Sequence, residues 1–216
     1  MVDLARMRSE YEQRGLDVAD VAPDPIDQFL VWLDDAVAAE LTEPNAMVVA
    51  TVDPEGRPAT RHVLCKGVSP APDGHRGLEF YTNRRSTKAD HLAANDHASA
   101  TFGWLGLHRQ VTLLGTAFPL TDAENDDYFV VRPRGSQLGA WASPQSEPID
   151  GRHVLDDALA AADARFPGPV DRPPHWGGYR LVPRAVEFWQ GRPNRLHDRV
   201  RYRLDGNTWI TERLAP

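Results

Sequence analysis

The sequence predicts a mainly β protein in which antiparallel strands form a barrel or a strongly curled sheet, with helices packed outside it. Three observations support this fold class. β-rich runs recur from Ala46 to the C-terminus, turn residues separate them at short spacing, and helical segments lie between some of them. The sequence contains no internal repeat and no low-complexity tract. We expect residues 1–23 to form an N-terminal arm and residues 24–216 a single domain.

The N-terminal region is expected to be a short helix or a mobile arm, followed by an amphipathic helix. Residues 1–23 are mostly polar. Asp24 then has the residue type of an N-cap, and Pro25 suits the first helical position. Apolar residues follow at helical spacing as far as Leu41, which predicts one core-facing helix over this segment.

From Ala46 the pattern changes to strands joined by short turns, with helices between some of them. The first strands are predicted at residues 46–52, 57–66, 77–83, 98–102 and 109–118. Helices are predicted at residues 86–95, 121–133 and 150–166. Ser86 and Thr121 are the expected N-caps of the first two, and Pro133 ends the second. The last strands are predicted at residues 177–183, 185–190, 195–204 and 208–214.

Composition and charge narrow the classes of function. The chain has 216 residues, 41% hydrophobic and 25% charged, as is usual for a globular protein. The formal net charge of −7 argues against general nucleic-acid binding, which usually needs a basic domain. The single Cys65 excludes an internal disulfide. With no secretory signal and no apolar stretch near the ~20 residues that span a bilayer, we expect a cytoplasmic protein.

An arginine-rich stretch stands out near the C-terminus of this acidic chain. If residues 195–204 form a strand, alternate side chains share a face. One face then holds Arg195, His197, Arg199, Arg201 and Arg203. The other face is apolar apart from Asp198, with Leu196, Val200, Tyr202 and Leu204. The basic face suits either solvent or a site for an anion or a ring, because a guanidinium can bind phosphate or stack on an aromatic system.

Two further polar sets could bind an anion. The first comprises Arg61, Lys66, Arg84, Arg85 and Lys88. Ser86 and Lys88 would lie at a helix N-terminus, which favours phosphate, although a serine cap with solvated cations explains the same residues. In the second set Tyr128 and Arg132 are four residues apart and would share a helix face, with Ser136 just beyond. These three could bind a phosphate, or they could belong to an exposed helix end with a loop.

Several other chemistries lack their motifs. There is no H-E-x-x-H, no P-loop, no G-x-G-x-x-G after a strand and no G-x-S-x-G. The eight histidines have no cysteine partners in a metal-binding spacing, so we expect no metal site. Cys65 is most simply a buried small hydrophobe.

At Val186–Arg199, "VEFWQGRPNRLHDR", the chain resembles the pyridoxamine 5′-phosphate oxidases, the FMN-dependent enzymes of vitamin B6 metabolism. The segments "RHVLCK", "FYTN", "RQV", "RPRGSQLGAW", "PQS", "HWGGYR" and "ERLAP" follow in family order, so the resemblance covers nearly the whole chain. It implies a split β-barrel that binds FMN, with helices outside the barrel. It also implies a homodimer with two FMN sites at the subunit interface.

The resemblance assigns a set of residues to FMN. They are Arg61, His62, Val63, Leu64, Cys65, Lys66, Tyr81, Thr82, Thr87, Lys88, Gln110, Gln145, Ser146, Trp189 and Arg199. Thr87 stands where many members have a basic residue, so we expect Arg84 or Arg85 to compensate for one lost phosphate contact. His62 and Cys65 replace residues that are usually apolar in the family.

The resemblance also assigns residues to the substrate. Those for its phosphate are Lys66, Tyr128, Arg132 and Ser136. Arg195, Leu196 and His197 would lie beside its ring, with Arg195 and His197 as the catalytic candidates. Arg8 and Tyr11 match a segment of the N-terminal arm that closes over the substrate as a lid. Arg201 and Arg203 lie beyond the matched motif and are expected to be solvated.

The implied reaction oxidises pyridoxamine 5′-phosphate or pyridoxine 5′-phosphate to pyridoxal 5′-phosphate. O2 accepts the electrons and gives H2O2, and the amine substrate also yields ammonia. Two alternatives remain open: a related flavin oxidase, for instance one of phenazine biosynthesis, and a non-catalytic protein that carries or senses flavin or pyridoxal phosphate. The intact "RPRGSQLGAW" and Tyr128 favour the B6 substrate.

Overall fold

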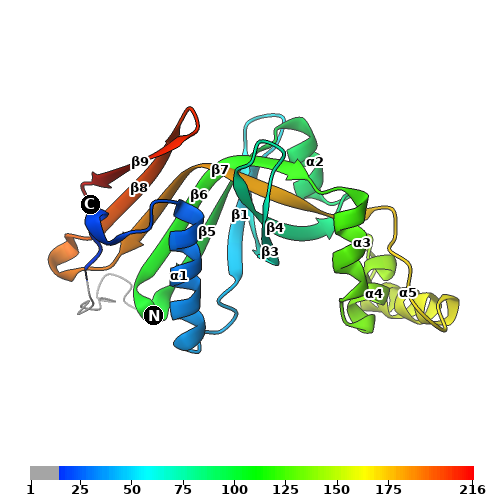
Figure 1. Cartoon of the computed structure of the whole chain (residues 1–216). Helices are drawn as coiled ribbons and strands as arrows, with labels where there is room; N and C mark the ends of the chain where they lie inside the picture. The colour runs from blue at the N-terminus through cyan, green and yellow to red at the C-terminus, as the bar shows by residue number, and fades with distance from the viewer. Residues whose placement is uncertain (1–14) are drawn as a thin grey trace. The chain divides into compact units, whose positions relative to one another are not determined.

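The computed structural model describes residues 15–216, so the predicted lid residues Arg8 and Tyr11 lie outside its described part (Figure 1). The strands are β1 (Ala46–Val52), β2 (Pro58–Leu64), β3 (Gly67–Pro70), β4 (Arg76–Asn83), β5 (His97–Trp104), β6 (Arg109–Pro119), β7 (Trp176–Gln190), β8 (Asp198–Asp205) and β9 (Thr208–Leu214). The α-helices are α1 (Pro25–Ala38), α2 (Thr87–Ala94), α3 (Asp122–Val130), α4 (Arg134–Ala142) and α5 (Arg152–Arg165). The 3-10 turns are η2 (Val18–Asp20), η3 (Leu105–Leu107) and η4 (Pro193–Arg195).

The strands form one mainly antiparallel sheet in the order β2-β1-β5-β6-β7-β4-β3, with β8 pairing with β7 and β9 with β8. The sheet is not closed between β2 and β3, so it is an open, curled sheet rather than a complete barrel. The mainly β class with helices is confirmed. The chain divides into two compact units, one of Met1–Val49, Ser99–Gly115 and Pro183–Pro216, the other of Ala50–Ala98 and Thr116–Val182. The arm boundary at residue 24 stays a prediction.

In the first unit, α1 begins where the sequence predicts. The Asp24 side chain accepts a hydrogen bond at 2.7 Å from the backbone N–H of the second helical residue, and Pro25 occupies the first position. This cap satisfies an N–H group that has no partner within the helix. The helix ends at Ala38, before the predicted end at Leu41. Glu40 has a φ of 53°, a left-handed conformation that a continuing helix does not allow.

Aromatic side chains form the core of the first unit. On α1, Phe29 packs on Phe102 of β5 with ring centroids 4.8 Å apart, and Trp32 meets Phe188 of β7 edge-on at 5.1 Å. Phe188 also contacts Tyr202 of β8 at 5.6 Å. Phe29, Phe102, Phe188 and Tyr202 are fully buried. Burial of one such ring contributes about 1.5–3 kcal/mol, so α1 is held to the strands mainly by these rings.

The predicted strand over residues 195–204 is wrong at its start. Residues Pro193–Arg195 form the turn η4, and Asn194 and Arg195 have φ angles of 59° and 64°. β8 begins only at Asp198. Proline has no N–H to give to a strand ladder, and a left-handed residue breaks the alternation of faces. Arg195 and His197 therefore do not share a strand face with the arginines that follow.

Those later arginines pair with carboxylates on neighbouring strands. Arg199 donates to Glu187 of β7 at 2.8 and 3.0 Å, and Arg201 donates to Glu212 of β9 at 2.6 Å. The side chains of Arg201 and Arg203 are 40% and 44% exposed. The positive charge of β8 is thus largely balanced within the first unit, and these pairs are exposed enough that each adds at most about 1 kcal/mol.

In the second unit, β4 runs antiparallel to the first half of β7, with Tyr81 opposite Gly178 and Phe80 opposite Tyr179. The sequence predicts two strands here, at residues 177–183 and 185–190, whereas β7 is one strand. Pro183 caused the wrong division. It lies between the pairing with β4, which ends at Leu181, and the pairing with β8, which begins at Ala185. The short strand β3, which pairs with β4, has no sequence prediction.

The helices α3, α4 and α5 lie together beside this unit's strands (Figure 1). Thr121 and Glu124 form a capping box at the start of α3, as the sequence favours. Helix α4 is missing from the sequence prediction, which has a loop after Pro133. Pro133 is instead the N-cap of α4, and glycines at 135 and 139 hide its helical character. None of the helices within residues 15–216 is long and apolar enough to cross a membrane.

Candidate functional site

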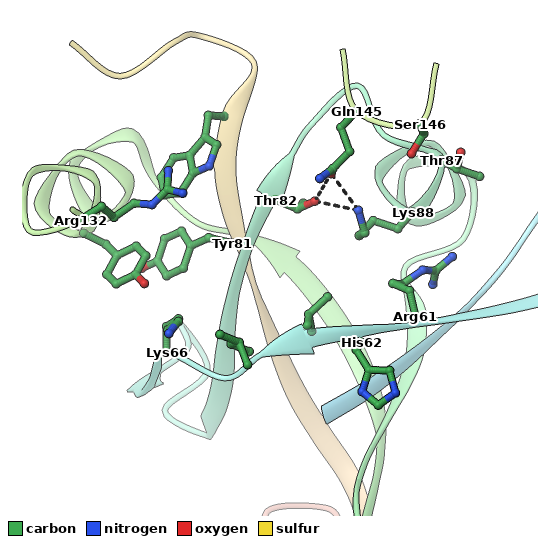
Figure 2. Close-up of a pocket in the computed structure, with 14 residues that line it drawn as sticks. Arg61, His62, Lys66, Tyr81, Thr82, Thr87, Lys88, Arg132, Gln145 and Ser146 are labelled. Carbon is green, nitrogen blue, oxygen red and sulfur yellow. Dashed lines mark hydrogen bonds between the residues drawn. The ribbon is translucent and has the colours of Figure 1, made fainter. Parts of the chain in front are cut away.

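A cavity of about 490 Å³ lies in the second unit. It is bordered by β2, β4, the start of α2, the end of α3 and the loop after α4 (Figure 2). Its lining residues are Arg61, His62, Val63, Leu64, Lys66, Tyr81, Thr82, Thr87, Lys88, Tyr128, Arg132, Gln145, Ser146 and Trp176. All of these except Trp176 are residues that the family resemblance assigns to FMN or to substrate phosphate. The fold thus brings together residues that are far apart in the sequence. The first, Arg61, and the last, Trp176, are separated by 115 positions.

The charge of this cavity is strongly one-sided. Four of its lining residues are cations, namely Arg61, Lys66, Lys88 and Arg132, and among the described residues that line it there is no aspartate or glutamate. Figure 2 shows Arg132 and Lys66 toward one end, and Arg61 and Lys88 toward the other. Low-dielectric walls strengthen the field of such cations. The cavity is therefore suited to a ligand, or a pair of ligands, with anionic groups at two separate places.

Lys88 is buried, and its hydrogen-bond acceptors within residues 15–216 are all neutral. Its Nζ donates to Thr82 Oγ1 at 2.9 Å, to Gln145 Oε1 at 3.0 Å and to Ser86 Oγ at 3.1 Å, and two of these bonds are drawn in Figure 2. The residue as a whole is 8% exposed to solvent. Burial, helped by the charge of Arg61, lowers the pKa of Lys88 to about 8. A phosphate beside this amine would supply the missing negative charge.

Arg61 is held in place by a short chain of hydrogen bonds. Its Nη1 donates to Thr51 Oγ1 at 2.8 Å and to the carbonyl of Ala59 at 3.0 Å. Thr51 Oγ1 lies 3.1 Å from Nδ1 of the buried His91 on α2. Burial lowers the pKa of Arg61, although a guanidinium stays charged at any physiological pH. Thr51 and His91 do not line the cavity, and the bond from Arg61 to Thr51 connects them to it.

Thr87 lines the cavity at the start of α2. The nearby Arg84 and Arg85 are not among the lining residues. Arg84 donates to the carbonyl of Leu120 at 3.1 Å and lies near Asp122. Arg85 lines a separate cavity of about 230 Å³. Neither arginine lines the cavity beside Thr87, and compensation by Arg84 or Arg85 stays a prediction.

The loop after α4 closes the Lys88 end. Gln145 Oε1 accepts hydrogen bonds from Thr82 Oγ1 at 2.9 Å and from Lys88. Ser146 has a φ of 74°, which is uncommon for a residue with a side chain. Such backbone strain often accompanies a ligand-binding loop, because the surrounding contacts must hold it in place.

At the other end, Arg132 is a half-buried cation whose Nη1 atom is a buried, unused donor. Its Nη1 has no hydrogen-bond partner anywhere in the part of the chain that the structure describes. The guanidinium lies over the ring of Trp176, 4.6 Å from its centroid. Helix α3 ends at Val130, so the prediction that Tyr128 and Arg132 share a helix face is wrong. A buried unpaired donor costs about 1–3 kcal/mol, which an anionic ligand would recover.

Three stacked rings form the wall beside Arg132. Tyr81 and Tyr128 have ring centroids 4.0 Å apart, and Tyr81 and Trp176 are 5.2 Å apart. Burial raises the pKa of Tyr128, so its hydroxyl is a neutral donor at pH 7. Trp176 is the lining residue that the sequence assignment misses. Its place in "HWGGYR" before two glycines is a signal that could have found it.

Ser136 does not line this cavity. It lies in α4 and lines an adjoining cavity of about 330 Å³, together with Arg132 and Tyr81. Cys65 also lies outside the main cavity, because its side chain points into the interior and is 7% exposed. Burial raises the pKa of its thiol to about 11, which keeps it protonated, and the prediction of a small buried hydrophobe is confirmed.

The remaining sequence-assigned residues belong to the first unit. They are Gln110 on β6, Trp189 on β7, Arg195 in η4, Leu196 and His197 in the loop that follows, and Arg199 on β8. Leu196 is 69% exposed, and Gln110 donates to Thr112 Oγ1 at 3.3 Å.

His197 is the most informative of these residues. Its ring lies 4.5 Å from that of Trp189. Nδ1 accepts a hydrogen bond from the backbone N–H of Arg192 at 3.1 Å. Burial and the charge of Arg195 lower the pKa of His197, which favours the neutral ring. Because Nδ1 is an acceptor, the proton of the neutral ring lies on Nε2.

An open, mainly antiparallel sheet with a cationic, aromatic-walled cavity defines a class of protein that is suited to phosphorylated ring ligands. Residues 33–165 match the family described as pyridoxamine 5′-phosphate oxidase, and residues 176–216 match the pyridoxine 5′-phosphate oxidase C-terminal dimerisation region. The chain belongs to the pyridoxamine 5′-phosphate oxidase family.

Full-length relatives carry the corresponding name. The pyridoxine/pyridoxamine 5′-phosphate oxidase 1 of Ralstonia nicotianae is 50% identical over 218 residues, covering 100% of both chains. The pyridoxine/pyridoxamine 5′-phosphate oxidase of Nocardioides sp. is 51% identical and covers 100% of this chain and 99% of its own.

Solved structures confirm the fold. PhzG from Burkholderia lata, crystallised with tetrahydrophenazine-1-carboxylic acid, is 33% identical with a TM-score of 0.85, covering 92% of this chain and 95% of its own. A pyridoxamine 5′-phosphate oxidase-related, FMN-binding protein from Nostoc punctiforme is 18% identical with a TM-score of 0.71, covering 91% and 100%. The predicted split-barrel fold is therefore confirmed, with the sheet open.

Proposed function

We propose that this chain oxidises pyridoxamine 5′-phosphate and pyridoxine 5′-phosphate to pyridoxal 5′-phosphate with FMN as its cofactor. One observation carries the proposal. The cavity of about 490 Å³ has cations at both ends and no carboxylate among its described lining residues. The cofactor and the substrate each bring one phosphate, which matches two anion sites. The names of the full-length relatives support the same reaction.

The Lys88 end suits the phosphate of FMN. Lys88 is a buried cation, Arg61 is a half-buried one beside it, and Thr87 and Ser146 add hydroxyl donors. Thr82 and Gln145 orient Lys88, while His62, Val63, Leu64 and Tyr81 contribute the surrounding walls. When bound, FMN supplies the two-electron oxidation that side chains cannot perform, and O2 takes the electrons to give H2O2.

The Arg132 end suits the substrate phosphate. The unused Nη1 of Arg132 and the neutral hydroxyl of Tyr128 would donate to phosphate oxygens, with Lys66 as a third contact and Ser136 reaching in from the adjoining cavity. Such a clamp fixes the reacting carbon against the cofactor. Correct placement of reactants can supply several kcal/mol of the barrier reduction.

Residues of the first unit would act at the substrate ring. We assign Arg195, Leu196 and His197 to the ring, and Gln110, Trp189 and Arg199 to the flavin. With its proton on Nε2, neutral His197 is a hydrogen-bond donor to the substrate rather than a base. Arg195 adds positive charge that can orient the ring and stabilise developing negative charge.

We further propose a homodimer in which each site takes groups from both chains. The match of residues 176–216 to a dimerisation region supports two chains in the enzyme. The predicted arm residues Arg8 and Tyr11 would close over the substrate. We also propose a cytoplasmic location, which accords with a chain that has one cysteine in its sequence.

A panel of substrates tests this function. We expect H2O2 and pyridoxal 5′-phosphate from both phosphorylated substrates, and little turnover of unphosphorylated pyridoxine, which cannot engage the clamp. The likeness to PhzG makes a reduced phenazine carboxylate the competing substrate class. Faster oxidation of such a compound than of pyridoxine 5′-phosphate would reject the proposal in favour of a phenazine-type oxidase.

A further inference from the structure

Arg180 of β7 is a buried arginine that joins three other elements of the second unit without lining the cavity. It is 5% exposed. Its Nε donates to Ser69 Oγ of β3 at 2.7 Å, and its Nη2 donates to Glu79 Oε1 of β4 at 3.2 Å. The same Nη2 also donates to Glu124 Oε1 of α3. One guanidinium thus bridges two carboxylates on different elements.

Each of these carboxylates leads to a tyrosine of the cavity wall. Glu79 Oε2 accepts a hydrogen bond from the Tyr81 hydroxyl at 3.3 Å. Glu124 Oε2 accepts from the backbone N–H and the hydroxyl of Thr121, both at 2.7 Å, and so caps the helix that carries Tyr128. Arg180 therefore bonds to both carboxylates: Glu79, which contacts Tyr81, and Glu124, which caps the helix of Tyr128.

The two tyrosines meet directly in the cavity. Their rings stack 4.0 Å apart with an angle of 22° between the planes. Tyr128 lies two residues before the end of α3, and Arg132 follows two residues after that end. A shift of α3 against β4 would therefore move the Tyr128 hydroxyl and the Arg132 guanidinium together.

The chemistry of arginine suits this task. Its planar group presents donors in a fixed geometry, so Ser69 on Nε and the two carboxylates on Nη2 are held in a defined arrangement. A buried ion pair is seldom needed for stability alone, because apolar residues of similar volume often serve as well. A buried bridge between a strand and a helix that both reach the cavity is better explained by the geometry it imposes.

We infer that Arg180 is a positioning residue, which sets the Tyr81–Tyr128 stack and thereby the place of the phosphate clamp. The inference rests on the proposed function for its kinetic consequence. In this view, Glu79 and Glu124 connect the buried Arg180 to the tyrosines of the cavity wall and so fix where these rings lie.

Arg180→Lys is the main test, because lysine keeps the charge but has no second nitrogen to hold Ser69 while the first bonds to both carboxylates. We expect KM for pyridoxine 5′-phosphate to rise on the order of tenfold while kcat changes far less, as for a slightly misplaced binding group. FMN affinity should change far less than KM, because Arg180 has no contact with Lys88 or Arg61 at the other end of the cavity. Glu124→Gln, which retains an oxygen for the Thr121 cap, should reproduce the rise in KM even if Arg180→Lys folds poorly.

Arg57→Lys is the matched control. Arg57 also bridges two carboxylates, Asp53 and Glu55, but in an exposed turn that has no contact with the cavity. It should leave KM unchanged. The inference is overturned if Arg180→Lys and Glu124→Gln leave KM unchanged, or if KM, kcat, FMN affinity and thermal stability all worsen together.

A spectroscopic measurement separates this inference from the proposed function. Near-ultraviolet circular dichroism of the ligand-free protein reports the stacked tyrosines without any substrate. We expect Arg180→Lys to alter the aromatic band and Arg57→Lys to preserve it. An unaltered band in Arg180→Lys contradicts the inference whatever the enzyme oxidises, whereas an altered band in a chain that fails to oxidise B6 substrates contradicts the proposed function alone.

Discussion

The guanidinium of Arg132 lies 4.6 Å from the ring centroid of Trp176, and its buried Nη1 has no hydrogen-bond partner within residues 15–216. The ring holds the cation in place while one donor remains available. This pairing is the sharpest sign of an anion site at this end of the cavity, because a buried donor is usually satisfied.

Arg132→Lys should weaken substrate binding strongly. A charge-assisted hydrogen bond contributes about 1.5–3 kcal/mol, so KM for pyridoxine 5′-phosphate should rise roughly 10- to 150-fold. Steady-state kinetics measure this effect, and fluorescence titration should show FMN affinity unchanged. Arg134→Lys is the control, since Arg134 bonds to Asp163 and to two backbone carbonyls away from the cavity. Equal effects of the two substitutions would remove Arg132 from the clamp.

FMN affinity should fall as the pH rises above about 8. Burial lowers the pKa of Lys88 to about 8 in the ligand-free protein, so the amine loses its charge above that pH. A phosphate stabilises the charged form, and binding then takes up a proton, which costs affinity in alkaline solution. Titrations with FMN from about pH 7 to pH 10 measure the slope. In Lys88→Met the affinity should be low and the slope absent, and a flat profile in the unaltered protein would contradict the assignment.

Thr51→Val should reduce FMN affinity although Thr51 does not line the cavity. The substitution keeps the shape of the side chain but removes the oxygen that accepts from Arg61 at 2.8 Å. Loss of one neutral acceptor contributes about 0.5–1.5 kcal/mol, which corresponds to a roughly two- to tenfold weaker FMN complex. Thr116→Val is a control, because Thr116 of β6 is not among the residues that line the cavity. Unchanged FMN binding in Thr51→Val would show that Arg61 needs no such support.

His197 should be neutral at pH 7 with its proton on Nε2. The lowered pKa and the bond from the Arg192 N–H to Nδ1 both favour this form. Nitrogen NMR of histidine-labelled protein distinguishes the tautomers, and loss of the signal in His197→Asn identifies the residue. Protonation of Nδ1 at pH 7 would contradict the donor role assigned to this ring.

Local signals in the sequence are sufficient for much of the fold. Asp24 followed by Pro25 marks the start of α1, and the run from Ala46 to Val52 coincides with β1. Both depend on neighbouring residues alone. The errors arise where a local signal is overridden. Pro183 predicts the end of a strand, although β7 continues through it. Pro133 predicts the end of a helix followed by a loop, although α4 begins directly after it.

The cavity depends far more on tertiary structure. Residue patterns alone indicate anion sites near Lys88 and Arg132, and the family resemblance names most of the lining residues. Neither could show that Arg85 lines a different cavity or that Ser136 lies in the adjoining one. Contacts such as those of Arg180 join residues far apart in sequence, and no local pattern encodes them.

The central claim is that a bound flavin in this chain oxidises a phosphorylated B6 substrate. An anaerobic titration of the FMN-loaded protein with pyridoxamine 5′-phosphate, and then with pyridoxine 5′-phosphate, tests it most directly by flavin absorbance. We predict bleaching of the flavin by either substrate, with the oxidised spectrum restored on admitting air. A flavin that stays oxidised in the presence of both substrates would contradict the proposed function.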